Sequence, residues 1–324
     1  MILIDADVLG RNRTGEETYV LNLLRGLPAA APDLRFAAVT RHPELVPDGV
    51  EAIALTTPSQ ELRMAWTFPR LLRRARPELL HTQHALPLGW SGKSVVTLHD
   101  LHFERDPGAM GLLDRLTFKA VVPHAARRAD RVLAVSERTK QDAVELYGIA
   151  PEKIAVTPHG VDPAFAPGGA PQGYALFVGA VQARKQPLVA LEQARAAGLP
   201  LVVAGPEKEP ALARRLRDEG ADVRGWVDKP ELAELYRGAT VLLLPSRYEG
   251  FGIPALEAMA SGTPVVVSDD PALREVVGDA AAPSVAAAVA DRDAYSRKGL
   301  ERAKLFSWQE AVRRTVDVYR EVLA

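Results

Sequence analysis

The chain has 324 residues. A single hydrophobic core usually supports fewer residues than this, so we expect two domains. A formal net charge of −1 argues against a broad nucleic-acid surface, and the absence of cysteine excludes disulfides and thiolate metal sites. The chain contains no apolar run of about 18 residues, and its first residues lack the basic start and apolar core of a signal peptide. These features predict a cytoplasmic protein.

The first half of the chain alternates short apolar strands with amphipathic helices. Residues 1–6 are the expected first strand, 11–18 form a polar loop that contains Gly15, and helical spacing begins at Thr18. A first strand, a glycine loop and a helix suggest a nucleotide-binding half. Further strands are expected near 35–39, 52–55, 79–81, 94–99, 131–135 and 154–157, with helices over 110–128 and 137–147.

A basic stretch, residues 60–76, interrupts this alternation. Five arginines and no acid lie between Arg63 and Arg76, interleaved with Trp66 and Phe68. Such a mixture is able to lie on an anionic membrane surface, and peripheral contact at the inner face of the membrane is one interpretation. The interpretation that we favour is a solvated helix face whose apolar side packs on the sheet.

Two of the expected strands end in histidine. Ligands in such sheets sit at the carboxyl ends of strands, so we expect His81, His84, His99 and His102 to lie near one another. Four histidines raise the alternative of a metal site. We expect no metal, because neither a carboxylate triad nor an HExxH-type helical spacing accompanies them. His99, which Asp100 follows, is also open to a second interpretation, a core residue satisfied by hydrogen bonds.

The second half repeats strand and helix more regularly. Residues 163–173, PAFAPGGAPQG, are rich in proline and glycine and form the natural linker. Strands are expected near 174–178, 199–204, 223–227, 240–244 and 263–268, separated by helices that prolines open and glycines close. This is the pattern of a parallel, doubly wound sheet. Ser307 and Glu310 form a capping box before a final amphipathic helix.

One stretch of the second half, Pro245 to Pro264, carries the strongest functional signal. Gly250 and Gly252 flank Phe251 between a buried strand and a helix. A glycine loop at a helix N-terminus favours phosphate binding through backbone amides and the helix dipole. Glu249 and Glu257 frame the loop and are suited to accept hydrogen bonds from sugar hydroxyls. The alternative is that the glutamates only complement the dipole.

A pair of adjacent cations follows the first strand of this half. Arg184 and Lys185 come after the turn that begins at Gly179. Arginine grips phosphate bidentately, and lysine adds a point charge. The alternative is a solvated basic pair.

These motifs resemble those of family 4 retaining glycosyltransferases with the GT-B fold. Residues 246–252, SRYEGFG, resemble the family's S-x-x-E-G-F-G, and 179–185 match its G-x-x-x-x-R-K. Residues 95–101, VVTLHDL, resemble its His-Asp signature, and 158–162 resemble its P-N-G-V-D hinge, with His159 replacing asparagine.

The resemblance implies an α/β fold of two Rossmann-like, doubly wound domains that face a central cleft. The acceptor-binding domain would comprise residues 1–162 together with the C-terminal helix 308–324, which crosses back onto it. The nucleotide-sugar-binding domain would comprise residues 174–307.

The resemblance also implies a reaction: metal-independent transfer of a hexose from a nucleotide sugar, GDP-mannose by first choice, to a sugar, lipid-linked or small-molecule acceptor. Glu249 and His99 would contact the transferred sugar, and Glu257 would bind the ribose. The groups expected at the diphosphate are Arg184, Lys185, Gly15, and the amides of Phe251 and Gly252. Where family members often carry a second glycine and a basic residue beside Gly15, this chain has Glu16 and Glu17.

Other functions stay open at this point. For the same reaction, the alternative donors to GDP-mannose are UDP-glucose and other nucleotide sugars. Within enzymes of this fold, the alternatives are a sugar epimerase and a phosphorylase. Outside enzymes, the alternative is a two-domain protein that closes on a small ligand. Consumption of a nucleotide sugar distinguishes them.

Overall fold

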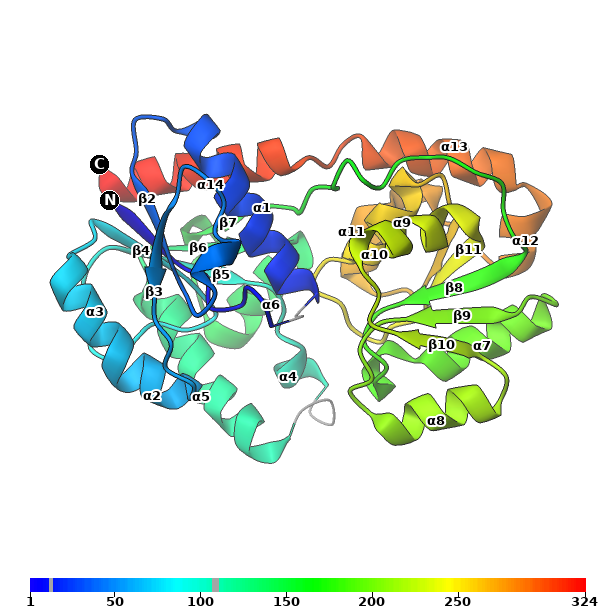
Figure 1. Ribbon diagram of the computed structural model, residues 1–324, viewed down its shortest axis with the longest axis horizontal. Coiled ribbons are helices and arrows are strands. Elements are labelled where there is room, and N and C mark those ends of the chain that lie inside the picture. The colour runs from blue at the N-terminus through cyan, green and yellow to red at the C-terminus, as the bar shows by residue number, and fades with distance from the viewer. Residues whose placement is uncertain (12–13, 107–110) are drawn as a thin grey trace. The chain divides into compact units, whose positions relative to one another are not determined.

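The computed structural model of the protein describes residues 1–11, 14–106 and 111–324, and at Thr14 and Leu112 the backbone only. The chain forms two compact units. Unit 1 comprises Met1–Leu101, Gly111–Gly160 and Trp308–Ala324, and unit 2 comprises Val161–Ser307 together with helix α4 (His102–Arg105). Each unit has its own parallel sheet with helices packed around it (Figure 1).

Unit 1 is built on a seven-stranded sheet in the order β3-β2-β1-β4-β5-β6-β7. Its inner strands are almost fully buried, as expected for a parallel sheet that is covered on both faces. The strand order reverses between β1 and β4, and ligands of such sheets bind outside the carboxyl ends there. The strands are β1 (Ile2–Asp5), β2 (Phe36–Thr40), β3 (Glu51–Ala54), β4 (Leu79–Gln83), β5 (Ser94–Leu98), β6 (Arg131–Ala134) and β7 (Ile154–Val156).

The C-terminal helix α14 packs on the first helix, α1, and both cover the sheet of unit 1 (Figure 1). A Cβ atom at Gly26 of α1 would come 2.7 Å from Val312 Cγ2, so glycine lets the two helices approach closely. The return of the chain's end to the first domain is confirmed. The helical elements of unit 1 are α1 (Thr14–Ala30), η1 (Pro43–Leu45), α2 (Gln60–Leu62), the π-helix η2 (Arg63–Thr67), α3 (Phe68–Ala75), α5 (Leu112–Arg128), α6 (Glu137–Tyr147), η4 (Pro151–Lys153) and α14 (Trp308–Leu323).

Unit 2 is built on a five-stranded sheet in the order β10-β9-β8-β11-β12. Its strands are β8 (Tyr174–Val178), β9 (Leu201–Ala204), β10 (Asp222–Gly225), β11 (Ala239–Leu244) and β12 (Val265–Val267). Besides α4, its helical elements are η5 (Ala183–Lys185), α7 (Pro187–Ala196), α8 (Pro210–Asp218), α9 (Lys229–Gly238), α10 (Ile253–Ala260), α11 (Pro271–Val277), η6 (Gly278–Ala280), α12 (Val285–Ala290) and α13 (Arg292–Ala303). Two parallel-sheet α/β units therefore confirm the predicted fold class.

The first helix begins earlier than predicted. All the expected strands are present close to their predicted places. The first helix begins at Thr14 rather than Thr18, so Gly15 lies in its first turn and not in a loop. Glu16 and Glu17 favour this earlier start, because acids stabilise a helix N-terminus. Residues 12–13 of the predicted loop, and residue 110 of the predicted 110–128 helix, lie outside the described residues.

Helix α4 groups with unit 2, although the sequence-based division assigned its residues to the first domain. One contact that accounts for this is the ion pair between Arg247 Nη2 and Asp106 Oδ2, at 2.7 Å. Among the helices that the structure describes, none has the length and apolar character needed to cross a bilayer.

Candidate active site

The stretch between β11 and α10 forms the predicted strand, tight loop and helix. Ser268 Oγ donates to the carbonyl oxygen of Ser246 at 2.6 Å, which ties the loop to the end of β12. Gly252 begins α10 with a φ of 109°, and a Cβ there would lie 2.5 Å from Leu273 Cδ2. Only glycine fits this position without strain. The N-terminus of α10 is thereby fixed beside the carboxyl edge of the sheet.

Glu249 is paired with a cation at this edge. Lys185 Nζ donates to both of its carboxylate oxygens, at 2.5 and 2.6 Å, although 64 positions separate the two residues. Burial raises the pKa of Glu249, but the charges of Lys185 and Arg184 lower it more, so the net shift is downward. The backbone amide of Glu249 also donates to Asp270 Oδ2 at 3.3 Å. Glu249 is therefore a buried, ionised and well-positioned carboxylate.

Arg184 lies beside this pair and is itself buried. Its Nη1 donates to the carbonyl oxygen of Tyr248 and lies 3.9 Å from Glu249 Oε2. Its Nε is buried and has no hydrogen-bond partner within the described part of the chain. The predicted phosphate-binding cations are thus not a solvated pair: both converge on the loop that carries Glu249.

Glu257 has a different environment, on the buried face of α10. Its Oε2 accepts a hydrogen bond of 2.8 Å from the hydroxyl of Tyr236, which lies on α9. Burial raises the pKa of Glu257 to about 8, although the Tyr236 hydrogen bond and Lys229 act in the opposite direction. The two glutamates therefore differ in charge near neutral pH: Glu249 is ionised, and Glu257 is mostly protonated.

The side chain of Phe251 points into the core. It is buried and packs edge-on against Phe306, with 5.8 Å between the ring centroids. Its predicted contribution to a ligand site is therefore restricted to its backbone amide.

In unit 1, His99 lies at the carboxyl end of β5. Its Nε2 is 2.8 Å from Gln83 Oε1, and its ring meets that of Tyr19 edge-on at 4.9 Å. Burial, with a smaller contribution from His84, lowers the pKa of His99 to about 4, although Glu16 and Asp100 oppose the shift. His99 is therefore neutral at pH 7, and a ring hydrogen bond rather than a positive charge is what it offers a substrate.

The other histidines have separate roles. His81 is a core residue: its Nδ1 lies 2.6 Å from Tyr319 Oη and its Nε2 2.7 Å from Thr97 Oγ1. His84 and His159 pack beside His99, with ring centroids at 5.3 and 6.1 Å. His102 lies on α4, which groups with unit 2. Within residues 1–11, 14–106 and 111–324, no group of three or more His, Asp or Glu side chains is arranged to hold a metal ion.

The acids beside Gly15 are turned towards partners in unit 1. Glu16 Oε1 lies 3.4 Å from His84 Nε2, and Glu17 Oε1 accepts a hydrogen bond of 2.7 Å from the amide of Gly10. The assignment of Gly15 to a diphosphate stays a prediction.

The basic stretch 60–76 is not a uniformly solvated face. Arg63 is fully buried in the π-helix and binds Asp5 through Nη1 and Nη2, at 3.0 and 2.6 Å. Trp66 is exposed, and the guanidinium of Arg70 stacks on its ring at 3.4 Å. Arg63 is thus a structural cation, which excludes it from the peripheral membrane contact considered above; contact through the other residues stays a prediction.

Three residues of these sites were not anticipated: Tyr236, Asp270 and Gln83. Asp270 lies three positions after the end of β12 and caps α11 by accepting from the amides of Ala272 and Leu273. Its position shortly after a predicted strand could have identified it from the sequence, because site residues in such sheets lie beyond the carboxyl ends of strands. Tyr236 lies on the apolar face of α9, where nothing in the sequence distinguishes it from an ordinary core residue.

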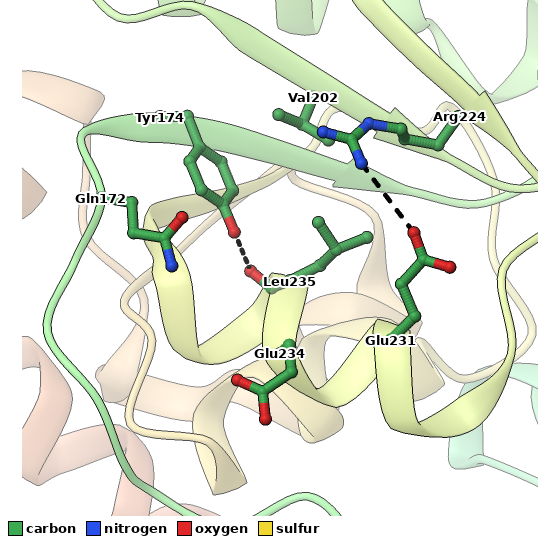
Figure 2. A pocket seen from close by; sticks show the side chains of 7 residues that line it. All are labelled: Gln172, Tyr174, Val202, Arg224, Glu231, Glu234 and Leu235. Atoms are coloured by element: carbon green, nitrogen blue, oxygen red, sulfur yellow. Dashed lines mark hydrogen bonds and ion pairs between the residues drawn. The ribbon is translucent and has the colours of Figure 1, made fainter.

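A hollow of about 330 Å³ lies elsewhere in unit 2, between α9 and the sheet (Figure 2). Two polar contacts join residues that line it: Tyr174 donates to the carbonyl of Leu235 at 2.7 Å, and Arg224 lies 3.9 Å from Glu231. None of the predicted site residues lines it.

Comparison with known proteins places the chain in a family. Residues 13–165 match the model of Glycosyltransferase Family 4, and residues 168–300 match that of Glycosyl transferases group 1. D-inositol 3-phosphate glycosyltransferase 2 of Catenulispora acidiphila is 32% identical over 75% of this chain and 70% of its own length. O-antigen chain mannosyltransferase B of Escherichia coli is 28% identical over 70% of each chain.

Solved structures share the fold. Sucrose-phosphate synthase of Thermosynechococcus elongatus superposes with a TM-score of 0.77 at 21% identity, covering 99% of this chain and 98% of its own. Anabaena HepE in complex with UDP-glucose gives a TM-score of 0.75 at 14% identity, with 99% of each chain covered. With two family models matched in succession and relatives covered over most of their length, this chain belongs to the family 4 (group 1) glycosyltransferases, enzymes of the GT-B fold.

Proposed function

We propose that this glycosyltransferase moves a hexose from a nucleotide sugar to a hydroxyl of a sugar, lipid-linked or small-molecule acceptor, with retention at the anomeric carbon and without a metal ion. The observation that carries the proposal is the buried Lys185–Glu249 pair, with Arg184 beside it. It brings two cations and one fixed carboxylate to the loop before α10. A sugar diphosphate needs these groups: cations and amides for the phosphates, and an acceptor for sugar hydroxyls.

The donor is held by the residues of unit 2. Arg184 and Lys185 bind the diphosphate together with the amides of Phe251 and Gly252. The buried Nε of Arg184, which has no hydrogen-bond partner among the described residues, is a donor that a phosphate oxygen would satisfy. Glu257 accepts hydrogen bonds from the ribose hydroxyls, and the neutral form that burial favours keeps acceptor capacity for them and adds one O–H donor.

In the proposed reaction, charged side chains of unit 2 stabilise the charges that develop on the donor. The acceptor oxygen bonds to the anomeric carbon on the face from which the diphosphate leaves, and the departing phosphate takes the hydroxyl proton. Arg184 and Lys185 neutralise the negative charge that develops on the leaving group, a task that a divalent metal performs in other enzymes. Glu249 holds hydroxyls of the sugar and stabilises positive charge at its anomeric carbon. His99, neutral and oriented by Gln83, offers its ring to a sugar hydroxyl.

GDP-mannose is the first donor to test, because relatives in this comparison are named mannosyltransferases. UDP-glucose is the second, because a structural neighbour is described in complex with it. The names of the relatives include an O-antigen chain and D-inositol 3-phosphate, so the acceptors to test include both glycans and phosphorylated polyols.

The test is a panel of nucleotide sugars and acceptors, with release of nucleoside diphosphate followed by chromatography. We expect one donor to be consumed in an acceptor-dependent manner, in excess EDTA as well as without it. Glu249→Gln should abolish turnover, and the exposed Glu192→Gln serves as the matched control.

Other outcomes contradict the proposal. A thermal shift with no consumption would indicate a binding protein. Conversion of the donor sugar without an acceptor would indicate an epimerase. Loss of turnover in EDTA, restored by magnesium, would overturn the metal-independent mechanism.

A further inference from the structure

A cluster of charged side chains lies at the carboxyl edge of the unit 1 sheet, apart from the residues assigned above. The Asp7 cluster consists of Asp5, Asp7, Arg11, Arg41 and Arg63. Asp5 ends β1, Arg41 follows β2 directly, and these two strands are neighbours in register. Ligands of doubly wound sheets bind outside this carboxyl edge, and β1 is one of the two strands between which the strand order reverses.

Asp7 is the centre of the cluster. Arg41 binds it bidentately, through Nε to Oδ1 at 3.0 Å and Nη2 to Oδ2 at 3.1 Å. Arg11 Nη2 lies 2.5 Å from the same Oδ2 atom. Two guanidinium groups therefore meet on one carboxylate oxygen. Arg63, buried beneath them and fixed by Asp5, lies 3.6 Å from Oδ1 through its Nε.

The cluster carries an excess of positive charge. Its three arginines share two aspartates. Glu17, a further acid close in sequence to Arg11, is not counted in the cluster; its Oε1 accepts the hydrogen bond from the amide of Gly10, between β1 and α1. Arg11 and Arg41 are 23% and 24% exposed, whereas Arg63 and both aspartates are buried. The net charge of the cluster thus faces solvent through Arg11 and Arg41.

Arg41 also has unused donors. Both of its hydrogen bonds to Asp7 use Nε and Nη2. Its Nη1 group makes no hydrogen bond to any residue that the structure describes. A guanidinium in this position is held rigidly on one side and is available on the other. Arginine in that state recognises phosphate and carboxylate groups well, since little side-chain entropy is left to lose.

We propose that Arg11 and Arg41, positioned by Asp7, form a subsite for an oxyanion, a phosphate or carboxylate group, carried by the acceptor. This proposal rests on the proposed function, since it names the class of acceptor. Asp7, Asp5 and Arg63 are positioning residues, and the two exposed arginines contact the anion. The preferred acceptor is then an anionic sugar or polyol rather than a neutral one.

The first test measures binding of inorganic phosphate by calorimetry, with the nucleoside diphosphate already saturating so that Arg184 and Lys185 are occupied. Arg41→Gln should weaken phosphate binding by about tenfold or more, because a charge-assisted contact is lost. Arg41→Lys, which keeps the charge, should recover part of it. Arg35→Gln is the matched control, since Arg35 is 80% exposed at the start of β2. Equal phosphate affinity in Arg41→Gln and Arg35→Gln would overturn the proposal.

The second test separates acceptor from donor. With mannose 6-phosphate and mannose, and with an inositol phosphate and inositol, Arg41→Gln should raise KM only for the phosphorylated member of a pair. If Arg41→Gln instead weakens the nucleoside diphosphate itself, the anion is the donor's and the acceptor assignment is wrong. If the enzyme transfers sugar to neutral acceptors and to none of the anionic ones, the proposal is also wrong. Failure of the proposed function would show separately, as the absence of nucleoside diphosphate binding in wild type.

Discussion

Replacing Glu257 by glutamine tests the buried carboxyl group of unit 2. Burial raises its pKa to about 8, against an ordinary value of 4.5, although the hydrogen bond from Tyr236 opposes the shift. The folded protein therefore binds this proton more tightly than the unfolded chain does. The resulting stability is fully present below pH 4.5 and is lost as the pH rises through 8.

The magnitude follows from the width of this window. One pKa unit corresponds to about 1.4 kcal/mol, so the loss between pH 5 and pH 8 is on the order of 4 kcal/mol. Glutamine keeps an acceptor oxygen for Tyr236 and carries no ionisable proton. We expect Glu257→Gln to resemble wild type near pH 5 and to exceed its free energy of unfolding by a few kcal/mol, roughly 2 to 4, at pH 8.

Urea titrations at pH 5, 6, 7 and 8 measure this difference. Glu249→Gln is the matched control with the opposite sign, because Lys185 and Arg184 outweigh burial and lower the pKa of Glu249. That variant should lose stability by a similar amount at every pH from 5 to 8, and its deficit should shrink only below pH 4.5, as the pH falls through the lowered folded-state pKa of Glu249. If the stability of Glu257→Gln relative to wild type is the same at every pH, the pKa of Glu257 is not raised in the folded protein.

The remaining predictions concern the donor site and the core. Arg184→Ala and Lys185→Ala should each weaken nucleoside diphosphate binding by about 1.5–3 kcal/mol in calorimetry, and unchanged affinity would remove both from the site. Glu249→Ala should abolish turnover while changing the affinity for the bare diphosphate little, whereas Glu257→Ala should weaken that affinity; equal effects on the diphosphate would contradict the separate roles. Tyr319→Phe should destabilise unit 1 by about 1–3 kcal/mol, because His81 Nδ1 loses its buried partner, and unfolding at the wild-type urea midpoint would contradict that.

Local patterns were sufficient to predict the elements of this fold. The apolar run at 240–244 is observed as β11, and the proline at 187 opens α7 as expected. The first helix was predicted too late, because the polar residues before Thr18 resemble a loop even though Glu16 and Glu17 suit a helix N-terminus. Strand order is a property of long-range pairing, and the local patterns do not determine it.

In the candidate site, too, local motifs predicted single residues but not the contacts between distant parts of the chain. Glu249 and Lys185 were each identified from a motif, but their direct pairing depends on how β8 and β11 lie side by side in the sheet. Arg63 was grouped with solvated arginines because charge runs usually face water. Its partner Asp5 lies 58 positions away, and only the folded sheet brings the two together.

The central claim is that a nucleotide sugar is consumed with retention of configuration through Glu249. The most direct measurement is NMR of the purified product made from an α-linked donor, with the one-bond carbon–hydrogen coupling at the anomeric position read for wild type, and with Glu249→Gln run in parallel. We expect an α-linked product from wild type and no product from Glu249→Gln. A β-linked product, or full turnover by Glu249→Gln, would contradict it.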